Sequence, residues 1–286
     1  MKKKIHRRYL AEFVARVLMI GSFALVALIL GLILWTLIQK GLPSLTWEMV
    51  SQTPKGGFYL GKEGGILNAI LGSLYMAGGG TLIALIFSLP IAIYLNTYLG
   101  SSRWGNYVRL VLDILWGIPS IVYGAFGFII MLSMGMRASL LGGTITLTLL
   151  ALPIMTRAMD EVIRRMPTDL SEAALALGST RLEIALRVTL PQMLPGILTA
   201  VLLAFGRVIG DAASVLFTAG YTDNIPTTLF RPVASLPLAV FFQLGTPFPE
   251  VQQRAYASAL ILTILVLILS IGSRLISSRL NKYTIK

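Results

Sequence analysis

The sequence predicts an all-α polytopic membrane protein with six transmembrane helices. Of its 286 residues, 56% are hydrophobic and only 13% are charged, whereas soluble proteins carry about 25% charged residues. Several apolar runs reach the roughly 20 residues that a helix needs to cross a bilayer. The chain has no cysteine and a single histidine, His6 in a basic segment, which excludes disulfides, thiol catalysis and cysteine metal sites.

The apolar runs divide the chain into a short N-terminal part and a larger transmembrane domain. A basic leader, residues 1–16, precedes the first span at residues 17–38, and a polar extracytoplasmic loop follows at residues 39–65. The first run is too long for the core of a cleavable signal, so we expect it to be retained. The transmembrane domain of residues 66–277 holds the other five spans, and a cytoplasmic tail of residues 278–286 ends the chain. These spans are expected at residues 66–99, 110–133, 138–156, 192–219 and 255–276.

Glycine and proline mark the irregular places in this domain. Residues 78–80, all glycine, and Pro90 interrupt the second span, where they allow a bend or a close helix contact. Gly117-Ile118-Pro119 lies inside the third span. The loop of residues 220–254 is rich in proline and aromatic residues, so we expect it to be either rigid and partly re-entrant or a docking surface.

The positively charged residues set the expected orientation. Seventeen of the 24 lysines and arginines lie in the leader, in the loops after the second and fourth spans, and in the tail. Six lie on the opposite side, and Arg207 lies inside a span. Because the side richer in Lys and Arg faces the cytoplasm, both termini and the loop after the fourth span are expected there. The net charge of +12 thus reflects membrane orientation rather than nucleic-acid binding.

The charged loop of residues 160–190 has the pattern of two short helices. Asp169 with Glu172, and Thr180 with Glu183, have the spacing of capping boxes at helix N-termini. Helices this short are marginal in water on their own. We therefore expect the pair to gain stability from a partner surface.

Two further residues mark where these helices end. Gly178 falls where the first helix should finish with a residue in the left-handed conformation. Pro191 is expected either to close the second helix or to open the next span.

The spacing within this loop resembles a named motif. Glu172-Ala173-Ala174, three residues, Gly178, nine residues and then Val188-Thr189-Leu190-Pro191 is similar to the EAA loop of ABC importer permeases, with Val188 in place of the usual isoleucine. The resemblance implies a type I ABC importer permease fold, whose cytoplasmic coupling helices dock on an ATP-hydrolysing subunit. It assigns ATPase coupling to Glu172, Ala173, Ala174, Gly178 and Pro191. The alternative is an ordinary interfacial helix pair with a glycine cap, because alanine-rich helices are common.

Arg207 and Asp211 are charged residues inside the predicted fifth span. A charge at a helix centre costs roughly 2.5–3.5 kcal/mol on insertion scales, so both side chains should face protein or water. Their i, i+4 spacing places them on one helix face, where they can neutralise each other. Either the pair is a buried staple between helices, or Arg207 lines an anion pathway and Asp211 holds it, since guanidinium matches phosphate oxygens in a two-pronged geometry. Asp113, near the start of the third span, is expected at the membrane interface.

Most of the chain, from about residue 64 to residue 276, also resembles the permease subunits of phosphate-specific ABC importers. The segments that carry this resemblance are Gly64–Ile66, Ile93–Asn96, Gly117–Gly124, Gly206–Ala213 and Pro247–Gln253. The compact length and the last of these segments are more similar to the PstA type of subunit than to its PstC-type partner. Asp211 stands where the family usually has glutamate, a difference that affects how Arg207 is held.

This resemblance implies a multi-pass permease of the cytoplasmic (inner) membrane that imports inorganic phosphate. Its expected partners are a dimer of ATP-binding subunits, a second homologous permease subunit, an extracytoplasmic phosphate-binding protein and membrane lipid, with no nucleic acid. No cofactor or metal is expected on this chain, since ATP is used by the partner subunit. The alternatives are a permease for another oxyanion, such as sulfate, molybdate or phosphonate, and a passive channel that needs no ATPase.

An enzymatic role is not expected. Gly56, four residues and Gly61-Lys62 fit most of a Walker phosphate-binding loop, but Glu63 stands where a magnesium-binding Ser or Thr is required. The predicted spans contain no histidine, no cysteine and no pair of close carboxylates, so they lack the cluster of groups that a membrane-embedded active site needs. The chain is therefore predicted to be a non-catalytic subunit of an ATP-hydrolysing transporter.

Overall fold

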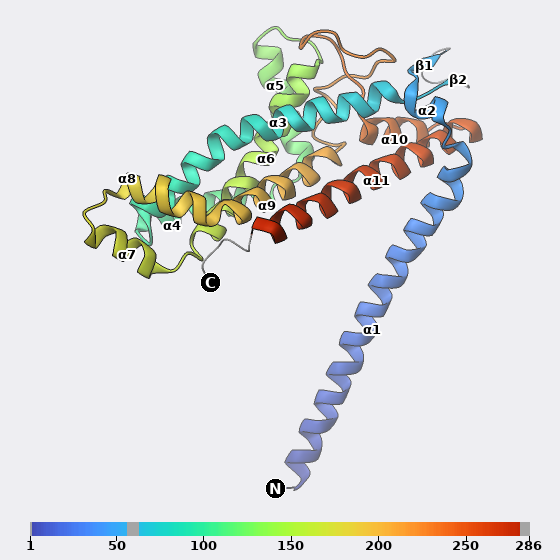
Figure 1. The fold of residues 1–286 in the computed structure, drawn as a ribbon. Helices are drawn as coiled ribbons and strands as arrows, with labels where there is room; N and C mark the ends of the chain where they lie inside the picture. Colours follow the sequence, from blue (N-terminus) through green and yellow to red (C-terminus); the bar gives the residue numbers. More distant parts are fainter. Residues whose placement is uncertain (1, 56–62, 281–286) are drawn as a thin grey trace.

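The computed structural model describes residues 2–55 and 63–280, which are mostly helical. Among these residues, five helices are long and apolar enough to cross a membrane, and a bent pair of shorter helices makes six spans if it counts as one (Figure 1). The prediction of an all-α polytopic membrane protein is confirmed. The helices are α1 (Lys2–Gly41), α3 (Leu67–Tyr94), α6 (Leu140–Ile163), α9 (Leu190–Ile209) and α11 (Pro249–Leu280), and the bent pair is α4 (Arg103–Gly117) with α5 (Ser120–Ser133).

The third predicted span is not one continuous helix. The axes of α4 and α5 differ by 97°, so residues 110–133, predicted as the third span, comprise the end of α4 and a separate helix α5. Pro119 disfavours the helical conformation at the preceding residue, and Ile118 is accordingly extended, with φ −69° and ψ 132°. The hydroxyl of Tyr123 donates to the carbonyl of Leu115 at 2.8 Å and so ties the two arms across the bend.

Helices α3 and α6 form the centre of the bundle. Gly79 and Gly80 of α3 lie against Thr144 and Leu147 of α6, and a Cβ on Gly80 would come within 3.0 Å of the Leu147 Cβ. α3 runs unbroken through these glycines and Pro90, so the predicted interruption of the second span is wrong. The glycines instead provide the close helix contact that small residues permit. The surrounding core includes Met76, Ala84, Ala151, Met155, Ile197 and Ala204.

The ends of three helices differ from the predicted spans. α6 continues to Ile163, beyond the expected end at residue 156, and α11 begins at Pro249 rather than at residue 255. α9 ends at Ile209 instead of residue 219, and residues 210–235 form no regular helix. Gly210 is a weak helix former, and the Asp211 carboxylate bonds the local backbone at Ser214 N instead of allowing the helix to continue.

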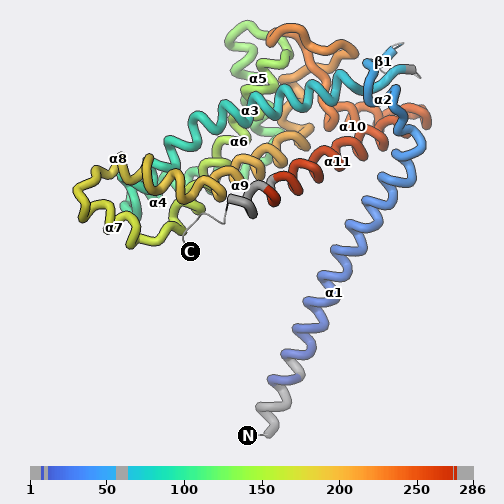
Figure 2. Tube along the Cα trace, viewed as in Figure 1, coloured from blue at the N-terminus to red at the C-terminus, as the bar shows by residue number. Residues whose placement is uncertain are grey.

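Helix α1 leaves the bundle as one long helix, clearest in the tube of Figure 2. It contains residues 2–16 of the predicted leader as well as the first span at residues 17–38. α1 meets α11 near its C-terminal end, where a Cβ on Gly41 would lie 2.7 Å from the carbonyl oxygen of Tyr256. The apolar side chains of the first span are otherwise exposed in the isolated chain.

Short elements gather at the end of the bundle where α1 joins it (Figure 1). The predicted loop of residues 220–254 contains one of them, a helix, and the first turn of α11. The Walker-like residues 56–62 lie outside the described residues. The short elements are η1 (Leu42–Ser44), α2 (Trp47–Ser51), α10 (Leu236–Leu244) and the antiparallel pair of β1 (Pro54–Lys55) with β2 (Glu63–Gly64).

Two buried polar side chains of α3 fix this end of the molecule. The side-chain amide of Asn68 donates to the carbonyl of Thr222 at 2.7 Å. The hydroxyl of Ser73 accepts a hydrogen bond from the backbone N–H of Leu236 at 2.8 Å. The irregular segment after α9 and the start of α10 are thereby held against the central helix.

Candidate coupling and transport sites

The charged loop after α6 forms the end of the molecule opposite to α2 and α10 (Figure 1). It folds into α7 (Thr168–Ala176) and α8 (Arg181–Ile184), followed by η3, a π-helical segment at Ala185–Thr189. The prediction of two short helices is therefore confirmed.

The turn between these helices has the predicted caps. Gly178 has φ +85°, a conformation that favours glycine. The hydroxyl of Thr180 accepts from the backbone N–H of Glu183 at 3.3 Å, and the Glu183 carboxylate accepts from the backbone N–H of Thr180 at 2.9 Å. This is the reciprocal capping box that the sequence predicts, and it fixes the start of α8.

The capping box predicted for Asp169 and Glu172 is wrong. α7 begins at Thr168, and its N-cap is Pro167, which makes no side-chain cap hydrogen bond. Pro167 precedes the first helical residue with φ −57°, so the helix starts two residues earlier than a box on Asp169 requires. Asp169 then lies in the first turn, where its negative charge still suits the helix N-terminus.

The coupling residues present an exposed surface around one buried contact. Ala174 is buried, while Glu172 and Ala173 are exposed. Leu177, next to the glycine cap, is 87% exposed. Large apolar side chains gathered on an otherwise charged end indicate a surface that another protein covers. The segment from α7 through η3, residues 168–189, is called the lever below. Its exposed leucines are Leu175, Leu177, Leu182 and Leu186.

Pro191 opens the following span, which was one of its two predicted roles. It lies in the first turn of α9, and the helical path from Arg181 to Ile209 is unbroken. The π-helical turn of η3 directly precedes it, and such a turn accommodates the backbone change at a proline inside a helix. The second short helix and the fifth span therefore form one rod.

A cavity of about 270 Å³ separates the coupling helices from the bundle. One wall comes from α3, its π-helical continuation η2 (Leu95–Leu99) and the end of α6. The other comes from α7, α8 and η3. The lining includes Asn96, Thr97, Ile163, Leu175, Ile184 and Thr189.

At the other end of α9, Arg207 and Asp211 form the predicted ion pair. Arg207 Nη1 and Asp211 Oδ2 are 2.8 Å apart, with 49% of the arginine side chain exposed and 3% of the aspartate. α9 ends between them, so Asp211 does not share the helix as expected. Its second oxygen accepts from the backbone N–H of Ser214 at 2.8 Å. Asp211 is therefore a fixed counter-ion for the Arg207 guanidinium, which remains about half exposed.

Helix α5 packs against the segment that begins with Asp211. Gly124 lies against the backbone of Ala213 and Ser214, and a Cβ on Gly124 would be 2.7 Å from the Ser214 carbonyl oxygen. The segment that begins with Asp211 is thus clamped by a close approach that only glycine allows here. Helix α5 therefore helps to position the segment that holds the counter-ion of Arg207.

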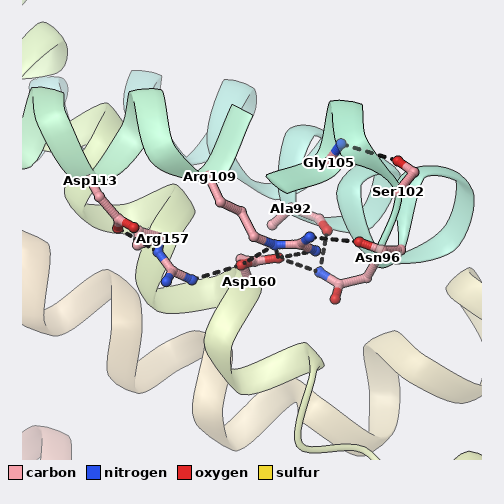
Figure 3. Close-up of polar contacts among 9 residues, drawn as sticks. Ala92, Asn96, Ser102, Gly105, Arg109, Asp113, Arg157 and Asp160 are labelled. Carbon is pink, nitrogen blue, oxygen red and sulfur yellow. Dashed lines mark hydrogen bonds and ion pairs between the residues drawn. The ribbon is translucent and has the colours of Figure 1, made fainter. Parts of the chain in front are cut away.

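A second ionic cluster was not predicted from the sequence. Asp160, fully buried in α6, accepts hydrogen bonds from Arg109 of α4, Arg157 of α6 and Asn96 of η2 (Figure 3). Arg157 Nε also bonds Asp113 Oδ1 at 2.6 Å, and the Asp113 side chain is 48% exposed. Two carboxylates, Asp113 and Asp160, therefore share the guanidinium of Arg157. The sequence signals for this cluster were the i, i+4 spacing of Arg109 and Asp113 in α4 and the i, i+3 spacing of Arg157 and Asp160 in α6.

Comparison with known proteins assigns this chain to a family. Residues 88–282 match the family model described as the binding-protein-dependent transport system inner membrane component. The phosphate transport system permease protein PstA of Haemophilus influenzae is 35% identical, over 90% of this chain and 92% of that protein. PstA 1 of Mycobacterium tuberculosis strain H37Rv is 32% identical, over 94% of this chain and 88% of that protein.

The fold also resembles that of a solved transporter. An inward facing structure of the MetNI methionine ABC transporter superposes with a TM-score of 0.62 and 20% sequence identity, over 75% of this chain and 95% of the matched one. The family match covers more than half of the sequence, and the relatives cover nearly all of it. The chain belongs to the binding-protein-dependent transport system inner membrane component family, and it is a multi-pass membrane permease of the type I ABC importer fold.

Proposed function

We propose that this chain is the PstA-type permease subunit of an ATP-driven importer of inorganic phosphate. Its relatives in Haemophilus influenzae and Mycobacterium tuberculosis are phosphate transport system permease proteins. The identities of 32–35% apply over 90–94% of the chain.

The observation that carries the proposal is the half-exposed guanidinium of Arg207. A buried carboxylate, Asp211, holds it by one nitrogen at 2.8 Å, which leaves its other donors available to an anion. Guanidinium binds phosphate oxygens in a two-pronged geometry and stays charged at physiological pH. Because the counter-ion already neutralises part of the charge, an arriving phosphate is held weakly and released again. Weak, reversible binding suits a transport path.

The α7–α8 pair supports the ATP-driven part of the proposal. Its exposed leucines give an ATP-binding subunit an apolar surface to cover. Closure of the ATPase dimer would pull this pair, and the unbroken rod from Arg181 to Ile209 would carry the movement to Arg207. The path then opens alternately to the two sides, as in other alternating-access carriers.

The same proposal names the remaining partners and the orientation. A second homologous permease completes the path beside Arg207, and an extracytoplasmic phosphate-binding protein delivers the anion. The excess of lysine and arginine on one side of the spans supports a cytoplasmic location for both termini and for the α7–α8 pair. This chain binds no ATP and catalyses no reaction; the partner subunits supply the hydrolysis.

The test is phosphate uptake by proteoliposomes that contain the whole transporter, with its binding protein on the outside. Arg207→Gln removes charge-assisted hydrogen bonds of about 1.5–3 kcal/mol, so the initial uptake rate should fall at least about tenfold. Assembly and ATP hydrolysis should stay near wild type. Arg274→Gln, which removes an exposed charge on α11, is the matched control and should leave uptake unchanged.

Two outcomes would overturn the proposal. Undiminished uptake by an assembled Arg207→Gln transporter would remove Arg207 from the path. Stronger inhibition of labelled phosphate uptake by excess sulfate, molybdate or phosphonate than by excess phosphate would assign the permease to a different oxyanion.

A further inference from the structure

The 270 Å³ cavity between the lever and the bundle has hydrogen-bond donors on both walls. Thr97 of η2 lies on the bundle side, and Arg181 of α8 and Thr189 of η3 lie on the lever side. The rest of the lining includes apolar side chains such as Ile163 and Ile184, and among the described residues no lining residue is acidic. Donors and positive charge without a carboxylate are the chemistry of an anion site.

Thr189 has a buried hydroxyl without a protein partner. The residue is only 8% exposed, and its hydroxyl makes no hydrogen bond to any of the described residues, although it lines the cavity. Buried threonines of α6 instead bond a carbonyl of the preceding turn, as Thr144 and Thr156 do at 2.8 Å and 2.7 Å. Because buried polar groups are almost always paired, the Thr189 hydroxyl requires a partner inside the cavity.

Arg181 supplies the positive charge of the cavity. Its guanidinium makes no ion pair within the part of the chain that the structure describes. The hydroxyl of Thr97, on the opposite wall, likewise has no hydrogen-bond partner there. A guanidinium and two hydroxyls can donate to several oxygens of one tetrahedral oxyanion. The cavity has many times the volume that one water molecule needs, so such an anion fits together with some of its water.

The start of α7 adds backbone donors to the lever wall. Thr168 and Ser171 of its first turn line the cavity. The N-cap, Pro167, makes no side-chain cap hydrogen bond, so the first backbone N–H groups of this nine-residue helix have no partner in the helix. Such a helix start favours an anion through these groups and through the helix dipole. Asp169 also lies in the first turn, but it is exposed and does not line the cavity.

One carboxylate lies behind the bundle wall of the cavity. Asp160 accepts a hydrogen bond at 3.0 Å from Asn96, which is a lining residue. Both Arg109 and Arg157 form ion pairs with Asp160, so its charge is offset within the bundle. Little net negative charge therefore opposes an anion in the cavity.

We propose that this cavity is a second oxyanion site, in which inorganic phosphate binds through Arg181 and Thr189 of the lever and Thr97 of the bundle. The choice of phosphate rests on the proposed function, because phosphate is the anion that the permease would release at this end of the bundle. The site is separate from Arg207, which lies at the other end of α9. Since its donors come from both walls, a bound phosphate would link the lever to the bundle.

The first experiment measures equilibrium binding of radiolabelled inorganic phosphate to the assembled, nucleotide-free transporter in detergent, without its binding protein. Every sample carries Arg207→Gln, so the transport path of this chain does not contribute. Arg181→Gln removes charge-assisted hydrogen bonds, so the affinity for one bound phosphate should fall at least about tenfold. Arg187→Gln, at an exposed arginine of the lever that does not line the cavity, is the matched control and should leave binding unchanged.

Two results of this experiment would overturn the proposal. Unchanged phosphate binding in Arg181→Gln would show that the cavity holds water only. An equal loss of affinity in Arg187→Gln would show a general effect of positive charge instead of a site.

Thr189→Val tests the buried wall without changing charge. It keeps the branched shape of the side chain, so it decides the question if Arg181→Gln does not assemble. Phosphate affinity should fall roughly two- to tenfold. Without phosphate, the unfolding midpoint should equal or exceed that of the parent, because an unpaired buried hydroxyl has been removed. Unchanged affinity would overturn the proposal, and so would a lower midpoint without phosphate, which would show that the hydroxyl has a protein partner.

The second experiment separates free phosphate from a phospholipid headgroup, which carries the same phosphate chemistry. Phosphate binding should be equal in phospholipid-free detergent and in nanodiscs of phosphatidylcholine or of phosphatidylglycerol. If phosphatidylglycerol abolishes phosphate binding and is itself retained only when Arg181 is present, the site belongs to a lipid and the assignment to free phosphate is wrong. None of these measurements involves uptake, so a failure of phosphate uptake would overturn the proposed function alone.

Discussion

Replacing Asp211 in two ways separates its structural contact from its charge. In Asp211→Ala, the buried backbone N–H of Ser214 loses its acceptor at 2.8 Å, which costs about 1–3 kcal/mol. The lost ion pair adds about 0–1 kcal/mol, because Arg207 is half exposed. In Asp211→Asn, the amide oxygen still accepts from Ser214, so the total cost should stay below about 1 kcal/mol.

The measurement is the thermal unfolding midpoint of the assembled transporter, followed by the fluorescence of single-tryptophan variants of this chain. At about 2 °C per kcal/mol for a chain of this size, Asp211→Ala should lower the midpoint by roughly 2–8 °C and Asp211→Asn by less than about 2 °C. Both should slow phosphate uptake, because an uncompensated Arg207 holds the anion longer. Equal destabilisation by Asn and Ala would refute the reasoning, since the ion pair rather than the Ser214 contact would then anchor the segment.

Two further changes test other regions. Leu177→Asp places a charge on a side chain that is 87% exposed beside the glycine cap of the lever. Because an apolar contact buried in the complex is lost, co-purification of the ATP-binding subunit should fall at least about tenfold. Leu229→Asp, at an exposed leucine outside the lever, should leave co-purification unchanged. Burial raises the pKa of Asp223 above its ordinary value, so the folded state retains a proton that the unfolded state has released. Stability should therefore decline as pH rises from about 3.8 through the folded pKa. Asp223→Asn should remove this decline in unfolding curves recorded between pH 4 and 8, and an identical slope in the variant would contradict the assignment.

The lever was the part of the fold most open to prediction. Gly178 and the Thr180 capping box depend on residues within a few positions of one another, so their local chemistry determines the result. The apolar runs likewise predicted the helices that cross the membrane. The box on Asp169 failed because Pro167 sets the start of α7, a stronger local constraint than a side-chain cap.

Features that depend on distant segments could not be predicted. Asp160 meets Arg109 and Asn96 across 51 and 64 residues, and nothing near Asp160 in the sequence indicates that its partners are there. The bend at Pro119 lies inside a run whose hydropathy suggests one span. The end of α9 was missed because residues 212–217 are still mostly apolar, while their true place is decided by contact with Gly124 of α5.

The π-helical turn at Ala185–Thr189 sets the angular register between the two ends of the rod. A π turn holds one residue more than an α turn, and each residue of an α-helix turns the chain by roughly 100°. Shortening this turn by one residue would therefore rotate the Arg207 side chain about a third of a circle relative to α7, with every other contact of α9 displaced in the same sense. The direction in which the guanidinium faces is thus set about twenty residues away, by the length of a single turn next to α8.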